Sequence, residues 1–153
     1  MKTINIETSR FGVITVDQDA VITFPEGILG FEDARRFTLV PQGPENPFVW
    51  LQSAERPALA FLLMPPRVAF SDYAPPLPPG IPRAVTLWAM VTIPAGRPHD
   101  MTLNLLGPIV IDPIGQRGWQ IVLADDRYTT RHRVFPPQPV TVDVTFALAG
   151  SAR

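Results

Sequence analysis

Few residues of this chain are of the types that carry out catalysis or hold metals. The 153-residue sequence contains no cysteine and two histidines, His99 and His132. Without cysteine, disulfides, thiolate zinc sites, iron–sulfur clusters and cysteine nucleophiles are excluded. Both histidines stand among polar residues typical of loops, so we expect their side chains to be solvated. No histidine or carboxylate pair has the spacing of a metal site, and we therefore expect no metal and no cofactor.

The serines, the glycines and the charge balance also argue against an enzyme or a nucleic-acid-binding protein. No serine occupies the Gly-x-Ser-x-Gly turn that exposes a nucleophile, and no glycine run has the spacing of a phosphate-binding loop. The 13 basic and 14 acidic residues give a net charge of -1, too small to attract nucleic acid or an anionic membrane. We predict a non-enzymatic protein without direct nucleic-acid binding. The alternative is a small ligand-binding or hydrolytic barrel that uses Asp72, His99 and Asp100 at a loop-lined mouth.

Polar side chains inside otherwise apolar runs are the informative positions for a binding protein. Each such side chain either completes an internal hydrogen bond or faces a partner. The runs are Leu51-Gln52-Ser53, Phe70-Ser71-Asp72-Tyr73 and Leu103-Asn104-Leu105. Our candidates for partner binding are Gln52, Phe70, Asp72, Tyr73 and Asn104. For Asn104, which precedes Gly107-Pro108, a second interpretation is that its amide completes a turn, and Gln52 is open to a similar structural interpretation.

These candidates must be positioned mainly by strands. The 19 prolines among 153 residues leave little room for long helices. Runs rich in Val, Ile, Thr, Phe and Trp predict strands at 3–7, 12–16, 20–24, 37–40, 48–53, 58–64, 84–93, 101–105, 109–111, 119–123 and 140–148. A helical turn is predicted at 30–36, where acidic residues precede basic ones. The pattern indicates an all-β fold, a small antiparallel β-barrel-like single domain over 1–153 with one short helical turn and proline-rich loops.

Three segments have a distinctive pattern. The run 84–93 is apolar at almost every position, as in a central strand covered on both faces. The run 140–148 alternates strictly between apolar and polar residues, as in a half-buried strand. Residues 74–82 contain five prolines and predict an extended surface loop.

Nothing in the sequence predicts export or membrane insertion. The longest apolar run, 58–64, is far shorter than the roughly 20 residues of a membrane-spanning helix. The first ten residues alternate polar with apolar and lack the apolar core of a secretory signal. We therefore expect a cytoplasmic protein without a membrane segment.

Several spaced motifs follow one another along the chain. The first is Phe24-Pro25-Glu26-Gly27-Ile28-Leu29-Gly30-Phe31, with the pattern F-x-x-G-I-x-G-F. Then come Pro47-Phe48, Leu51-Gln52-Ser53, Ala60-Phe61, Phe70-Ser71-Asp72-Tyr73, a stretch from Thr102 to Asp112, and Tyr128-x-Thr130-Arg131. In order and type these motifs resemble the flagellar assembly factor FliW family over about residues 3–134. Residues 135–153 form an extension with one predicted strand and no counterpart among these motifs.

The resemblance implies a cytoplasmic β-barrel-like protein without enzymatic activity that binds flagellin and the RNA-binding translational regulator CsrA. In that family, flagellin leaving the cell frees the factor, which then captures CsrA and relieves repression of flagellin messenger RNA. An exposed aromatic ring beside a carboxylate, as at Phe70, Asp72 and Tyr73, is suited to anchor a basic protein. The loop 74–82 departs from the family pattern because it contains no acidic residue. A dedicated flagellin chaperone without CsrA binding is therefore the second interpretation, and the oligomeric state is left open.

Overall fold

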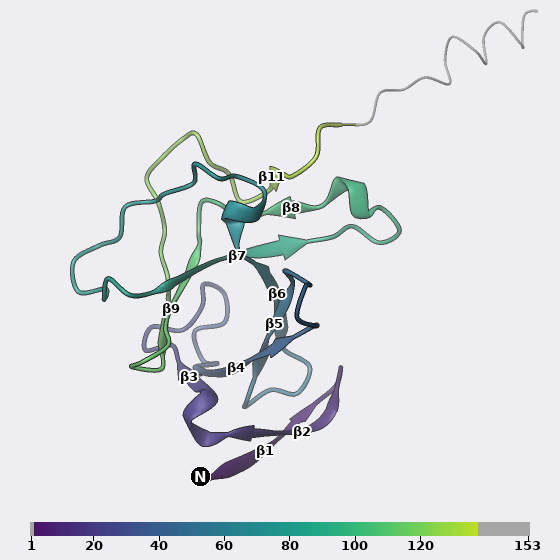
Figure 1. The fold of residues 1–153 in the computed structure, drawn as a ribbon, viewed down its shortest axis with the longest axis vertical. Helices are drawn as coiled ribbons and strands as arrows, with labels where there is room; N and C mark the ends of the chain where they lie inside the picture. Colours follow the sequence, from purple (N-terminus) through teal and green to yellow (C-terminus); the bar gives the residue numbers. More distant parts are fainter. Residues whose placement is uncertain (1, 138–153) are drawn as a thin grey trace, which may run out of the picture.

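The computed structural model describes residues 2–137, which form short strands joined by loops (Figure 1). The strands are β1 (Thr3–Thr8), β2 (Gly12–Asp17), β3 (Val21–Thr23), β4 (Arg36–Pro41), β5 (Val49–Ser53), β6 (Ala60–Met64), β7 (Thr86–Thr92), β8 (Thr102–Leu103), β9 (Ile109–Asp112), β10 (Arg117–Gln120) and β11 (His132–Arg133). The helical elements are the 3-10 turns η1 (Gln18–Ala20), η2 (Pro66–Val68) and η3 (Pro98–Asp100). Within the described residues, no helix is long and apolar enough to cross a membrane.

Seven strands close into a barrel. Antiparallel pairings connect β3, β4, β5, β6 and β7 in order, and continue from β7 to β9 and from β9 to β10. A parallel pairing of β10 with β3, at Arg117 and Thr23, completes the ring. The hairpin β1–β2 lies outside the ring at the bottom of Figure 1, and β8 and β11 extend from β7 at the top. The predicted all-β barrel is thus confirmed, although one pairing is parallel.

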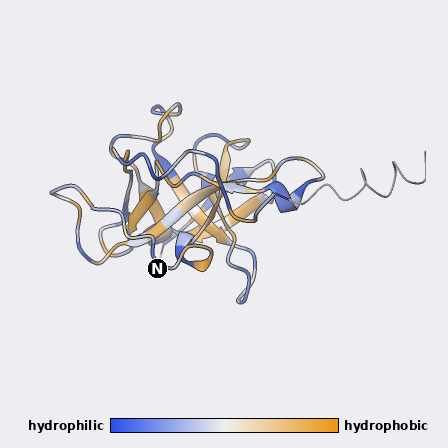
Figure 2. Ribbon diagram, turned by 90° about the horizontal axis from the view of Figure 1, so that it is seen from above, coloured by the Kyte–Doolittle hydropathy of each residue, from blue (hydrophilic) through white to orange (hydrophobic). Residues whose placement is uncertain are grey.

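The apolar side chains form two buried clusters. The first fills the barrel and includes Phe24 and Phe37, whose rings meet edge to face with centroids 5.3 Å apart. The second lies where β7, β8 and the loop after η2 meet, and it includes Tyr73 and Leu103. Figure 2 shows most of the hydrophobic colour on the strands, with hydrophilic residues gathered in the surrounding loops. Burial of these two clusters is the main source of the stability of the fold.

The F-x-x-G-I-x-G-F segment plugs one end of the barrel. Ile28 is buried in the first cluster, and the ring of Phe31 packs edge to face on Phe61 at 5.3 Å. Gly27 has φ of +70°, and a Cβ there would lie 2.6 Å from the Cα of Glu32. The helical turn predicted at 30–36 is wrong, because Gly30 adopts φ of +87° and the segment forms an isolated tight turn, closed by Ala34 N donating to Phe31 O at 3.0 Å, before β4 begins at Arg36.

The predicted strands within residues 2–137 are found, with shifts at their ends. Within the run 119–123, strand β10 ends at Gln120. Ile121 N still donates to Pro108 O at 2.9 Å in the same register, but Pro108 has no N–H to return the second hydrogen bond of the ladder. The central position of the run 84–93 is confirmed, since β7 pairs with β6, β8 and β9. Of its residues, only Ala89 is fully buried, so the strand is not covered on both faces along its length. The run 140–148 lies outside the described residues.

Candidate functional site

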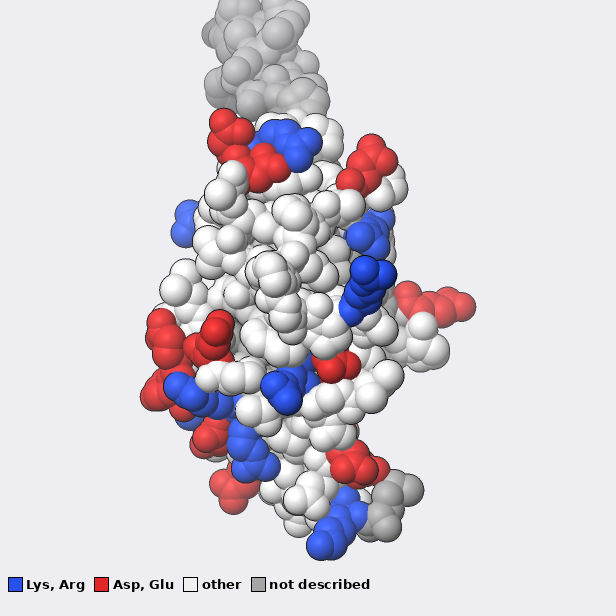
Figure 3. Space-filling view, turned by 90° about the vertical axis from the view of Figure 1, so that its left-hand side faces the viewer, with Lys and Arg blue, Asp and Glu red and all other residues white. Residues whose placement is uncertain are grey.

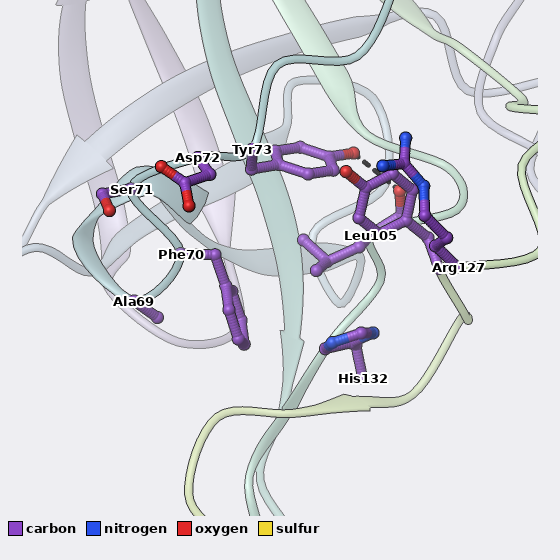
Figure 4. Close-up of a pocket in the computed structure, with 9 residues that line it drawn as sticks. Ala69, Phe70, Ser71, Asp72, Tyr73, Leu105, Arg127 and His132 are labelled. Carbon is purple, nitrogen blue, oxygen red and sulfur yellow. Dashed lines mark hydrogen bonds between the residues drawn. The ribbon is translucent and has the colours of Figure 1, made fainter.

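A cleft of about 430 Å³ opens between three segments that are distant in the sequence (Figure 4). The loop after η2 supplies one wall, the stretch leading into β11 supplies the opposite wall, and the turn after β8 supplies the floor. The lining residues are Ala69, Phe70, Ser71, Asp72, Tyr73, Leu105, Arg127, Tyr128 and His132. The pairing of His132 with Leu103 across β11 and β8 holds this second wall against the floor. The cleft contains Phe70, Asp72 and Tyr73 of the residues predicted for partner binding.

Tyr73 has a structural role in this cleft. Its side chain is only 2% exposed, and its hydroxyl donates to the carbonyl oxygen of Leu105 at 2.6 Å. The ring meets Tyr128 edge to face, with centroids 5.0 Å apart. Burial raises the pKa of Tyr73 well above its ordinary value of 10, and the neighbouring Tyr128 raises it further. The expectation of an exposed ring is therefore wrong for Tyr73.

Phe70 and His132 form an aromatic pair in the cleft. Both side chains are half-buried, and their rings meet edge to face with centroids 5.1 Å apart. Figure 4 shows the ring of Phe70 directed toward His132. The expectation of a solvated His132 is wrong, because Phe70 and Tyr128 pack around the imidazole. This pair gives the cleft an aromatic surface that remains partly accessible.

The charged groups of the cleft differ in how they are paired. Arg127 donates to Asp125 from Nη2 at 2.7 Å and from Nε at 3.1 Å, and these hydrogen bonds lower the pKa of Asp125. The charge of Arg127 is therefore balanced within its own loop. Asp72 is exposed, and no other residue of the described chain makes a hydrogen bond or salt bridge with its carboxylate. The cleft thus combines partly buried rings with one available negative charge.

Two predicted residues lie elsewhere and make internal contacts. Gln52 on β5 is 0% exposed, and its Nε2 donates to the carbonyls of Ser53, Pro57 and Leu59 at 3.0–3.2 Å. It therefore braces the loop between β5 and β6 and offers no surface to a partner. Asn104 is half-buried, and its Oδ1 accepts from Gly107 N at 2.8 Å, as its turn interpretation predicts.

The residues of the hydrolytic alternative do not converge. The ring of His99 stacks on Phe135 with centroids 5.0 Å apart. Asp100 accepts from Arg133 Nη2 at 2.9 Å, and this hydrogen bond lowers the pKa of Asp100. Neither residue lines the cleft that contains Asp72. Across residues 2–137, no group of three or more histidine and carboxylate side chains is arranged to hold a metal ion.

Sequence reasoning missed the opposite wall of the cleft, formed by Arg127, Tyr128 and His132, and its floor at Leu105. The motif Tyr128-x-Thr130-Arg131 marked this region, yet it gave no sign of which segment it faces. The two-residue strand β11 is too short for a periodicity signal. Only the folded arrangement brings this wall opposite Phe70.

Comparison with known proteins gives one consistent result. The family model described as FliW protein matches residues 5–134. The flagellar assembly factor FliW of Heliobacterium modesticaldum is 41% identical over 144 residues, covering 89% of this chain and 94% of that protein. The protein of the same description from Geobacter sulfurreducens is 42% identical over 139 residues, covering 86% of each. A crystal structure of the flagellar assembly factor FliW matches with a TM-score of 0.81 and 33% identity, covering 89% of this chain and 100% of that chain.

Proposed function

Because this chain belongs to the FliW family of flagellar assembly factors, we propose that it binds flagellin and antagonises the translational regulator CsrA. Acting in the cytoplasm without catalysis, it couples the level of flagellin to the translation of flagellin messenger RNA. Flagellin occupies the factor while it accumulates, and its export leaves the factor free to capture CsrA. The motifs that resemble the family, including Phe70-Ser71-Asp72-Tyr73, support this proposal.

The observation that carries the proposal is the cleft beside Asp72. Protein interfaces gain most of their affinity from a few aromatic anchors in desolvated pockets, and charge complementarity selects the partner. The half-buried ring of Phe70 offers such an apolar contact, and the free carboxylate of Asp72 suits a basic RNA-binding protein. We assign the CsrA contact to Asp72 and Phe70, with Tyr73 as the support that holds this loop in place.

A dedicated flagellin chaperone is the second candidate function. The loop 74–82 contains no acidic residue, and most of its residues, Leu77 among them, are exposed. On the face drawn in Figure 3, basic and acidic residues are interspersed around a broad uncharged area. With a net charge of -1, long-range steering of a basic partner is weak. These features favour a partner recognised mainly by apolar contact.

Titration calorimetry of the purified protein with flagellin, with CsrA and with both tests the proposal. We expect each partner to bind, and bound flagellin to prevent capture of CsrA. If neither partner binds below about 10 μM, corresponding to about -7 kcal/mol, the proposal is wrong. Binding of flagellin alone identifies the dedicated chaperone instead.

The substitution Asp72→Arg tests the assigned surface without disturbing the core. We expect it to weaken CsrA binding at least tenfold, or about 1.4 kcal/mol, and to leave flagellin binding unchanged. Glu45→Arg is the matched control, because Glu45 is also exposed but lies in the loop between β4 and β5. Equal effects of the two charge reversals on CsrA binding would place the contact elsewhere.

A further inference from the structure

The two ends of the barrel differ. One end is plugged by the loop after β3, with Ile28 and Phe31 inserted. At the opposite end, where β3 and β7 begin, a cavity of about 290 Å³ opens outward. We call it the barrel mouth, and its lining residues are Asp19, Ala20, Ile22, Thr38, Leu39, Thr86, Trp88, Ile111, Pro113 and Gln116. It shares no residue with the cleft beside Asp72.

The floor of the barrel mouth is apolar. Ile22 and Ile111 are buried and belong to the cluster that fills the barrel. Leu39 and Trp88 pack against this cluster but keep part of their surface exposed. These four side chains come from four different barrel strands, so the floor is held by the closed sheet itself. Such a mouth is a preformed pocket, as in other barrels that bind ligands.

The hydroxyl and indole hydrogens of the lining are donated to acceptors within the protein. Thr38 Oγ1 donates to Ala20 O at 3.3 Å, and Thr86 Oγ1 donates to Ile111 O at 3.3 Å. The indole Nε1 of Trp88 donates to Thr86 Oγ1 at 2.9 Å. Apart from the second amide hydrogen of Gln116, a ligand in the mouth therefore meets mainly carbon surface and hydrogen-bond acceptors, which favours a ligand rich in donors.

One negative charge stands at the rim. Asp19 is the charged residue of the lining. Both its backbone N–H and its backbone carbonyl make hydrogen bonds. Its N–H donates to Asp17 Oδ1 at 2.9 Å, and its carbonyl accepts from Gln116 Nε2. Over residues 2–137, no hydrogen bond or salt bridge engages the Asp19 carboxylate. The mouth thus offers a free carboxylate and the indole of Trp88 above an apolar floor.

We propose that the barrel mouth binds an arginine side chain of a protein partner. The guanidinium carries only donors, stacks on the face of an indole and pairs with a carboxylate, while its aliphatic stem packs on apolar carbon. The volume is just below the range of about 300–1,000 Å³ typical of drug-sized ligand sites, which fits one long side chain better than a cofactor. This second contact goes beyond the proposed function, because it requires neither flagellin nor CsrA.

The test uses the capped amino acid Nα-acetyl-arginine-N-methylamide, titrated into the full chain and followed by the indole N–H signals in NMR spectra. The signal of Trp88 is identified by its loss in Trp88→Phe, which separates it from Trp50 and Trp119. We expect a saturable shift of the Trp88 signal. The capped citrulline analogue has the same shape without the charge, and it should bind at least threefold more weakly.

The variant Asp19→Asn and its control locate the charge that selects arginine. We expect Asp19→Asn to remove the preference for arginine over citrulline, and Glu26→Gln, an exposed carboxylate in the plugging loop, to preserve it. Two results with the unaltered chain overturn the proposal. One is the absence of a saturable shift of the Trp88 signal, and the other is equal binding of the capped arginine and the capped citrulline. If butylguanidinium binds but capped arginine does not, the occupant is a free small cation and the assignment to a protein side chain is wrong.

Discussion

Polar side chains at the loop junctions hold this barrel together as much as they offer contacts to partners. Three polar residues stand in apolar runs: Tyr73, Gln52 and Asn104. The side chain of each forms a hydrogen bond with a backbone group. A buried polar group without a partner is costly, and these three side chains bond backbone groups near the loops, although Gln52 Oε1 is itself buried without a hydrogen-bond partner among the described residues. Exposed Asp72 is the exception, and it is the residue of this set that is free for recognition.

Removal of the Tyr73 hydroxyl tests this structural role. Tyr73→Phe keeps the ring that packs on Tyr128 but leaves the buried Leu105 carbonyl without its donor at 2.6 Å. We expect a loss of about 1–3 kcal/mol in the free energy of unfolding. Urea unfolding followed by circular dichroism measures it, and Thr15→Val, which removes an exposed hydroxyl on β2, should cost much less. An unchanged midpoint for Tyr73→Phe would mean that the hydrogen bond contributes nothing.

The same residue predicts how stability depends on alkaline pH. Burial raises the pKa of Tyr73 in the folded state above its ordinary value of 10. The unfolded chain then loses this proton first, so the contribution of Tyr73 is complete below about pH 10 and declines as the pH rises further. We expect the difference in unfolding free energy between the unaltered chain and Tyr73→Phe to shrink between about pH 10 and pH 12. A constant difference over this interval would contradict a raised pKa.

Among the connecting elements, the loop that plugs the barrel depends on a glycine for two reasons. Gly27 has φ of +70°, and a Cβ at this position would lie 2.6 Å from Glu32 Cα. Gly12 has nearly the same φ, +69°, but nothing lies within 4 Å of its missing Cβ. Gly12→Ala therefore isolates the cost of the left-handed backbone, about 1–2 kcal/mol. We expect Gly27→Ala to cost about 1–3 kcal/mol more, because the plug must move. Thermal unfolding of both variants measures the difference, and equal costs would rule out crowding.

The strands were predictable because their signal is local, whereas the ends of the elements depend on distant partners. Runs of apolar, β-branched and aromatic residues marked the barrel strands. The acidic-to-basic order at 30–36 favoured a helical turn, but the backbone conformations of Gly27 and Gly30 and the packing of Phe31 impose tight turns instead. Likewise β10 ends at Gln120 because the next residue, Ile121, lies opposite Pro108, which has no N–H to donate back.

The candidate site was predictable on one wall only. Phe70 and Asp72 stood out because polar and aromatic residues adjoin there in the sequence. Tyr128 and His132 did not, since their role follows from the pairing of β11 with β8. Burial was the property that the sequence could not reveal, and it reverses the expected roles of Gln52 and Tyr73, which are 0% and 2% exposed.

At the scale of the whole molecule, the closed sheet separates the two regions that we propose as partner contacts. The cleft beside Asp72 lies on the second buried cluster, outside the barrel ring. The barrel mouth lies at the end of the first cluster, inside the ring. The closed ring has no free strand edge, so recognition at the ring itself depends on side chains and loops. Partners of different chemistry can therefore use the same small fold.

The closure of the ring also predicts what the last residues contribute. All seven barrel strands lie between Val21 and Gln120, and the match to the FliW family ends at residue 134. A chain ending at residue 137 therefore keeps both buried clusters. We expect its thermal midpoint to stay within about 4 °C of that of the full chain, the shift produced by about 1 kcal/mol.

A chain ending at residue 126 is the informative comparison, because it lacks Tyr128 and β11 and so uncovers Tyr73. We expect this shorter chain to unfold at a clearly lower temperature, since it loses one side of the second cluster. If the chain ending at 137 is destabilised as strongly, then the strand predicted at 140–148 is part of the folded barrel, and residues beyond the family match are needed for its stability. Differential scanning calorimetry of the three chains separates these outcomes, because a strand that completes the fold adds to the enthalpy of unfolding as well as to the midpoint.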